Sequence, residues 1–169
     1  HSLVGHHTVD QTHLEGAPCV DAVAGEEELE GVAGLKVYKD LPQMFADAFF
    51  FQMKINDQTT RVGSGKLDGS GIPLDFFSDL DVRKGFSYCF DWETYIRDAM
   101  LGEAKQISSP AIEGLPYRNP NAAKYSLDLA KAEEHLRAAW GGQVWEKGFK
   151  FQLLYNTGNL SRQTACQIL

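Results

Sequence analysis

The order of helical segments and prolines within residues 81–159 constrains the fold of this chain most strongly. Apolar residues recur at helical spacing over residues 81–90 and again over 128–140. Between these stretches the loop SSPAIEGLPYRNPN contains three prolines, which cannot continue a helix. We therefore expect helices on either side of an extended loop, followed by a half-buried strand over residues 149–155, where apolar residues alternate.

Capping residues mark where these helices begin and end. Asp79 or Asp81 can cap the first helix, and Asp91 can cap a second helix that ends at Gly102. A last amphipathic helix begins near Leu160 and the chain ends inside it, which favours a fragment of a longer protein. The residues expected on inward helix faces are Val82, Phe86, Cys89, Phe90, Leu129, Ala132, Leu136 and Ala139.

Upstream of these helices the sequence predicts strands. The run ADAFFFQMKIN, residues 46–56, is almost continuously apolar, which is typical of a strand buried on both faces of a parallel or mixed sheet. Shorter strands are expected at 20–25 and 35–42, with a short helix at 26–30. Residues 57–72 are polar and rich in glycine, which predicts an exposed loop. Together these elements predict an α/β fold with a mixed sheet and flanking helices.

Composition excludes several classes of partner and site. The formal net charge is −7 and no basic stripe is present, which argues against nucleic acid and anionic membrane as main partners. No apolar run approaches the length of a membrane-spanning helix, and no signal peptide is found, so a targeting segment would lie outside this chain. Cys19, Cys89 and Cys166 are too far apart for metal-ligand spacing and are expected to be buried or unpaired thiols.

Six landmarks follow one another in a fixed order, and the order is more specific than any one of them. They are the strand AFFFQMKIN, the helix start Asp81-Val82-Arg83, the junction Phe90-Asp91, the loop SSPAIEGLPYRNPN, the helix KAEEHLRAAWG and the strand ending LLYNTGN. This order resembles the extracellular solute-binding proteins of the peptide/nickel class, family 5, which are the receptors of ABC importers. The resemblance covers residues 20–169 and is stronger from Asp81 onward.

The resemblance implies part of a type II periplasmic-binding fold, mostly its second lobe. Residues 1–48 would end the first lobe, 49–56 would cross the hinge, and 57–169 would form a truncated second lobe. The implied function is capture of a peptide-like or other small polar solute between two lobes, for import through an ABC permease in the membrane. The implied location is the periplasm or the extracellular face of the membrane, and the implied protein is not an enzyme and needs no cofactor.

Two departures from the family pattern limit what can be transferred. The short link that usually joins the crossing strand to the Asp81-Val82-Arg83 helix is expanded here into the glycine-rich segment. The acidic residue by which the family holds the N-terminus of a peptide follows the LLYNTGN strand, beyond Leu169. Peptide specificity is therefore not transferred to this chain.

Four residues are candidates for contact with a solute: Phe51, Gln52, Lys54 and Asn156. Gln52 and Lys54 follow the aromatic run where a crossing strand would reach the ligand, and Phe51 could supply an apolar wall. Asn156 ends a strand and could hydrogen-bond a solute, although capping of the turn in NTGN is slightly favoured. Core packing for the phenylalanines and a surface role for Gln52 are the competing interpretations.

The sequence supports other kinds of binding site or catalytic site less well than a solute site. The sequence GSGK at residues 63–66 lacks the spacing of a phosphate-binding loop, so a nucleotide-dependent enzyme is a remote hypothesis. His6, His7 and His13 could chelate a metal but fall in an irregular tail, and His135 is expected on a solvated helix face. A further hypothesis is a structural or interaction module that no longer binds solute and that self-associates through exposed apolar surface.

Overall fold

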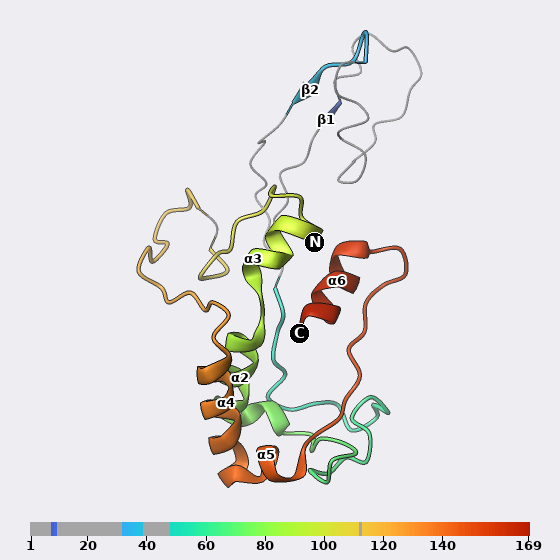
Figure 1. The fold of residues 1–169 in the computed structure, drawn as a ribbon, viewed down its shortest axis with the longest axis vertical. Coiled ribbons are helices and arrows are strands. Elements are labelled where there is room, and N and C mark those ends of the chain that lie inside the picture. Colours follow the sequence, from blue (N-terminus) through green and yellow to red (C-terminus); the bar gives the residue numbers. More distant parts are fainter. Residues whose placement is uncertain (1–7, 10–31, 39–47, 112) are drawn as a thin grey trace. The chain divides into compact units, whose positions relative to one another are not determined.

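The computed structural model describes residues 8–9, 32–38, 48–111 and 113–169 (Figure 1). The chain divides into two compact units. The first contains residues 1–47 and 96–124, and the second contains residues 48–95 and 125–169. The elements predicted at 20–25 and 26–30, and the end of the strand predicted at 35–42, lie outside the described residues.

The first unit contains a short antiparallel pair of strands, β1 (Thr8–Val9) and β2 (Val37–Tyr38). Thr8 lies opposite Tyr38 in this pair, so the strand predicted over 35–42 is confirmed at residues 37–38. β1 falls in the segment expected to be an irregular tail, and that expectation is wrong at Thr8 and Val9. The proline-rich segment has no helix or strand in its described residues, as its composition predicts.

The second unit is built mainly from helices. Two of them, α2 (Leu80–Cys89) and α4 (Leu129–Ala138), lie side by side (Figure 1). A glycine at position 85 permits this approach, because a Cβ atom there would lie 2.7 Å from the Cγ atom of Leu136. The remaining helices of this unit are η1 (Phe76–Ser78), α3 (Trp92–Thr94), η3 (Ala139–Gly142), α5 (Gln143–Lys147) and α6 (Leu160–Ile168). A single turn of π-helix, η2 (Tyr95–Ala99), follows α3.

The helix caps agree largely with the sequence. Asp79 caps α2, because its Oδ1 atom accepts from the N–H groups of Asp81 and Val82 at 2.7 and 3.3 Å. Of the two capping residues that the sequence offered, Asp79 and Asp81, the structure therefore shows Asp79. Asp91 caps α3 as predicted, and Asn159 caps α6. Leu129 was expected to face inward, but it is 65% exposed at the first position of α4.

The core of the second unit is aliphatic at its centre and aromatic at one side. Its buried residues are Val62, Ile72, Phe76, Val82, Ala139 and Val144. Rings from three separate segments pack around them, namely Phe51, Phe76, Phe77, Phe86, Phe149 and Phe151. Neighbouring ring centroids are 5.1 to 6.3 Å apart, within the range at which aromatic rings attract one another. Through these contacts, segments without helix or strand, such as those that contain Phe51 and Phe149, pack in the same core as the helices.

The glycine-rich segment is largely an exposed loop, as predicted, but its two ends are anchored in this core. Val62 and Ile72 at its two ends are buried, and Ile72 N–H donates to the carbonyl of Val62 at 2.9 Å. Gly63 and Gly71 form an antiparallel bridge in which the backbones almost touch, and a Cβ atom on Gly63 would collide with the carbonyl oxygen of Ser70. The glycines therefore permit a tight turn, and the buried side chains of Val62 and Ile72 attach the two ends of the turn to the core.

The strands predicted at 46–56 and 149–155 do not form in the described residues. Residues 48–56 make two backbone hydrogen bonds to the residues that follow, from Ile55 N–H to the Leu74 carbonyl at 2.7 Å and from Thr59 N–H to the Asn56 carbonyl at 3.2 Å. Gln152 N–H donates to the Arg61 carbonyl at 3.0 Å, but no ladder continues from it. The apolar side chains of these segments are used for ring packing, so their hydrophobicity does not indicate a sheet.

Among the described residues, regular strands occur only in β1 and β2. The mixed sheet expected for an α/β fold is thus not confirmed. The helices predicted over 81–90 and 128–140 and from Leu160 are confirmed, whereas the helix predicted to end at Gly102 consists of α3 and the π-helical turn η2, which ends at Ala99. Continuous apolar runs were misleading.

Candidate functional site

The predicted solute contacts near residue 52 lie on residues 48–56, a segment beside α2 and α3 that has no helix or strand and that bends at Met53 and Lys54 (Figure 1). Phe51 is half-buried, and its ring packs against Phe77 and Phe86 with centroid distances of 5.4 and 6.3 Å. Gln52 and Lys54 are both exposed. Phe51 is therefore placed as a packing residue, while the two polar candidates are accessible to a solute.

Alternate residues attach this segment to the rest of the unit. Phe51 is held by its ring contacts, Met53 by a 3.2 Å contact between its Sδ atom and Nη1 of Arg83, and Ile55 by its backbone bond to Leu74. The backbone bends at Met53 and Lys54, and Met53 is 50% exposed despite its contact with Arg83. Gln52, Met53 and Lys54 are therefore all exposed between the attachments at Phe51 and Ile55.

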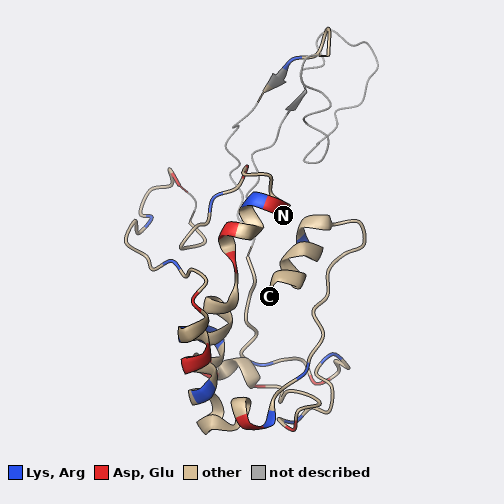
Figure 2. Cartoon of the chain, in the orientation of Figure 1, with Lys and Arg blue, Asp and Glu red and all other residues tan. Residues whose placement is uncertain are grey.

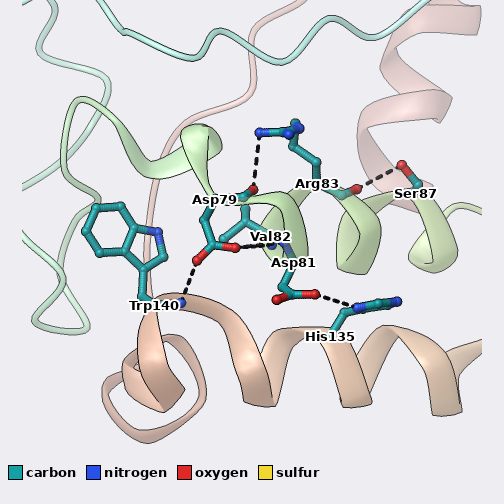
Figure 3. Close-up of polar contacts among 7 residues, drawn as sticks. All are labelled: Asp79, Asp81, Val82, Arg83, Ser87, His135 and Trp140. Atoms are coloured by element: carbon teal, nitrogen blue, oxygen red, sulfur yellow. Dashed lines mark hydrogen bonds and ion pairs between the residues drawn. The ribbon is translucent and has the colours of Figure 1, made fainter.

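Arg83 connects this segment to the start of α2, because its Nη1 atom contacts Met53 and also donates to the Asp79 carbonyl, the bond drawn in Figure 3. Its Nη1 atom lies 2.6 Å from the carbonyl oxygen of Phe77 and 2.8 Å from that of Ser78, and it donates to these two carbonyls just before the helix. A guanidinium has several donors in a fixed plane, so one side chain can bind several acceptors. The Asp81-Val82-Arg83 landmark thus has a structural explanation, in which Val82 enters the core and Arg83 holds the preceding turn.

Asn156 is exposed and takes part in the turn before α6. Its Oδ1 atom accepts from Nη1 of Arg162 at 3.2 Å, and its carbonyl accepts from Asn159 N–H at 3.2 Å. These bonds agree with the interpretation of Asn156 as a turn residue. Within the described part of the chain, no hydrogen bond or ion pair joins Asn156 to Gln52 or Lys54.

His135 does not lie on a solvated face, which corrects the prediction. Its Nδ1 atom is 2.8 Å from Oδ1 of Asp81 (Figure 3), and its side chain is 20% exposed. Its ring is parallel to that of Tyr88. The error arose because Glu133 and Glu134 beside it are exposed, while His135 itself turns towards α2. The residue joins two helices and has the geometry of a packing contact.

The charges on α4 form local pairs. Figure 2 shows acidic and basic residues on the same helix, and Arg137 donates to Glu133 at 2.7 Å one turn away. Lys131 lies 3.0 Å from Asp128, the residue that caps the helix. Such exposed ion pairs contribute little to the free energy of unfolding. Because each pair combines opposite charges, the helix offers a partner no surface of a single charge.

The other candidate chemistry finds no support in the described residues. The GSGK sequence lies in the tight turn, where Ser64 donates its hydroxyl hydrogen to Asp68 at 2.8 Å, so a carboxylate is bound where a phosphate would be needed. Burial raises the pKa of the thiols of Cys89 and Cys166, which lowers their reactivity. Within the described ranges no three His, Cys, Asp or Glu residues are grouped to hold a metal, and His6, His7, His13 and Cys19 lie outside these ranges.

The sequence did not predict two features of this site. Phe50 is 83% exposed, although the aromatic run suggested that it would be buried with its neighbours. The contact of Met53 with Arg83 was also missed, because nothing in the sequence links residues 30 positions apart. The sequence carries no signal that would have identified Phe50, because the adjacent Phe49 and Phe51 have the same side chain.

Comparison with known proteins gives one match. Residues 24–169 match the sequence model described as bacterial extracellular solute-binding proteins, family 5 Middle. Neither the curated proteins nor the solved structures that were compared give a match. In the part of the chain that the structure describes, no helix is both long and apolar enough to cross a membrane.

Proposed function

We propose that this chain, which belongs to the bacterial extracellular solute-binding proteins of family 5, captures a peptide-like or other small polar solute between two lobes. The family provides the solute-binding components of ABC transporters, so its partners are a solute and a membrane permease. Its members act in the periplasm or outside the cell, and we extend that location to this protein. Binding is non-covalent, without turnover and without a cofactor.

The observation that carries this proposal is the exposure of Gln52 and Lys54 on a segment that is attached to the rest of the unit through Phe51 and Ile55. A solute site needs a few polar groups in a defined position, set beside apolar surface. Residues 49–56 would cross the hinge, with residues 1–48 in the first lobe and 57–169 in the second. Solute would favour the closed form only to the extent that it binds this form more tightly than the open one.

The test is a thermal-shift and calorimetric titration of the chain with a mixture of dipeptides to pentapeptides. A saturable rise in melting temperature is expected, and Gln52→Ala should weaken it. Gln58→Ala is the matched control, because Gln58 is also exposed and lies in the turn after the segment. No shift with any mixture, or equal weakening by both substitutions, would contradict the proposal.

A second candidate function is a self-associating interaction module. The observation that favours it is exposed apolar surface in the segment before α6 and at the start of that helix, where Leu154 is 65% exposed and Leu153, Tyr155 and Leu160 are also accessible. Sedimentation velocity over a range of concentrations tests it. Association that Leu154→Lys abolishes would support the module, and a single monomeric boundary at all concentrations would exclude it.

A further inference from the structure

The segment between α5 and α6 has the geometry of a single strand. Residues 148–156 connect α5 to the turn before α6 (Figure 1), and they contain no helix, turn or bend. The N–H groups of Lys150 and Gln152 both point towards the glycine-rich segment, where they donate to the carbonyls of Gly71 and Arg61 at 3.5 and 3.0 Å. In a strand every second residue directs its backbone groups to the same edge. One edge of this segment is therefore occupied, at its start, by the glycine-rich segment.

Side-chain exposure alternates along the same residues, as it does in a strand. Phe149 and Phe151 are half-buried against the core, and the residues that follow them are exposed. Further along, Leu154 is 65% exposed, whereas Leu153 and Tyr155 on either side of it are 39% and 44% exposed. The strand geometry thus continues to residue 155, past the last bond to the glycine-rich segment.

The opposite edge of this strand is unpaired. By the same alternation, Phe151, Leu153 and Tyr155 direct their backbone groups away from the glycine-rich segment. The N–H and C=O groups of these three residues make no hydrogen bond with any residue that the structure describes. An open strand edge is a template for another strand, and proteins usually protect such edges with charged residues or proline. Residues 151–160 contain neither, so this edge is both open and unprotected.

The same edge of a second copy is the partner that these features fit. The unpaired groups require another extended backbone, and the neutral, apolar sequence FQLLY favours a partner of the same character. An antiparallel pairing centred on Leu153 places Phe151 opposite Tyr155. It also places Lys150 opposite Asn156, so the two lysines do not face one another.

We propose that residues 151–155 pair with the same residues of a second copy, as two antiparallel strands related by a two-fold axis. The proposal rests on self-association, the second candidate function, and adds to it the strand that makes the contact, its register and the number of copies. Because the other edge is occupied at Lys150 and Gln152, the two free edges satisfy one another and the assembly closes as a dimer.

The first test separates backbone pairing from contact between apolar side chains, because proline removes the N–H group whereas alanine only shortens the side chain. Leu153→Pro should raise the dimer dissociation constant, measured by sedimentation velocity, at least about tenfold above that of Leu153→Ala, since each copy loses one hydrogen bond. The N–H of Leu154 lies on the other edge, so Leu154→Pro and Leu154→Ala should agree within about threefold. Equal effects of proline and alanine at Leu153 would overturn strand pairing.

The second test uses the unchanged chain and does not depend on whether a variant folds. In a mixture of differently labelled copies, NMR should show an NOE between Hα of Gln152 in one copy and Hα of Leu154 in the other. These residues would form a non-hydrogen-bonded pair, with Cα atoms about 4.5 Å apart. A dimer without this NOE would overturn the proposed pairing while self-association stands.

Two further outcomes would also overturn the proposal. Monomers at every concentration would exclude both strand pairing and self-association, and would leave solute capture untouched. If the chain is monomeric and the amides of residues 151–155 shift when the peptide mixture is added, the open edge binds an extended solute and not a second copy.

Discussion

The side chain of Asp79 accepts a hydrogen bond from the backbone N–H of Trp140 at 2.8 Å, and this bond joins the start of α2 to the end of α4. The same carboxylate caps α2 through its other oxygen (Figure 3). Trp140 has a positive φ of 52°, where the chain turns from α4 towards α5, and its indole N–H donates to the Phe76 carbonyl at 3.2 Å. One acidic residue thus fixes a helix end and an unfavourable backbone conformation together.

We predict that Asp79→Ala lowers the free energy of unfolding by about 2–3 kcal/mol, because a helix cap and a second hydrogen bond are lost together. Urea denaturation monitored by circular dichroism measures this change. Asp75→Ala is the matched control, since Asp75 is exposed and its side chain makes no capping bond to η1. The control should change stability by less than about 0.5 kcal/mol. Equal effects of the two substitutions would show that the Asp79 bonds contribute nothing specific.

A second prediction concerns the contact of Gly85 with Leu136. Gly85→Ala should destabilise the protein by about 1–3 kcal/mol because the new methyl overlaps the Leu136 side chain, although alanine is otherwise favoured in a helix by about 1 kcal/mol. In a Leu136→Ala background the overlap is removed, and the same substitution should be neutral or stabilising. This reversal is measured by a double-mutant cycle in urea. An equal penalty in both backgrounds would mean that the helices do not meet at Gly85.

A third prediction follows from the glycine turn. The Ser64 hydroxyl and then the Ser70 N–H donate to Asp68 and hold the pKa of its carboxyl below the ordinary value of 3.8. Because this pKa is lower in the folded state, the stabilisation is complete above pH 3.8 and is lost as the pH falls through the lower value. NMR titration of the Asp68 carboxyl carbon measures it. Ser64→Ala should raise the pKa of Asp68, and a pKa that does not move would show that the turn is not closed by this bond.

A fourth prediction concerns the thiol of Cys89, whose pKa is raised by burial. In a Cys19→Ser, Cys166→Ser background, Cys89 should react with an aromatic disulfide reagent several times more slowly at pH 7.5 in the folded protein than in urea, because less thiolate is present and access is restricted. The rate in the folded protein should rise with pH. A folded-state rate equal to the rate in urea would place Cys89 at the surface.

Helices and caps were predictable because their signals are local. Asp91 caps α3, and the capping bond joins residues three positions apart, so a short window of sequence contains it. The same local logic failed for His135, whose partner Asp81 lies 54 positions away. The spacing of apolar residues along a helix does not show which distant residues will contact it. These contacts determine which side of the helix is buried.

The extended segments were mispredicted for a related reason. A run such as Phe49 to Phe51 has the same composition whether it enters a sheet or packs its rings against a helix. In this structure Phe51 packs against Phe86 while Phe50 faces solvent. The order of the six landmarks was sufficient to predict the family, which the match over residues 24–169 confirms. The solute contacts among these residues remain a prediction.

Equilibrium dialysis tests solute capture most directly. The chain is dialysed against a defined mixture of short peptides, and mass spectrometry compares the solutes on the two sides of the membrane. We predict a saturable excess of at least one solute on the protein side, chemically unchanged, and a smaller excess for Lys54→Met. Equal concentrations of every solute on both sides, or conversion of a solute into a product, would contradict solute capture by this chain.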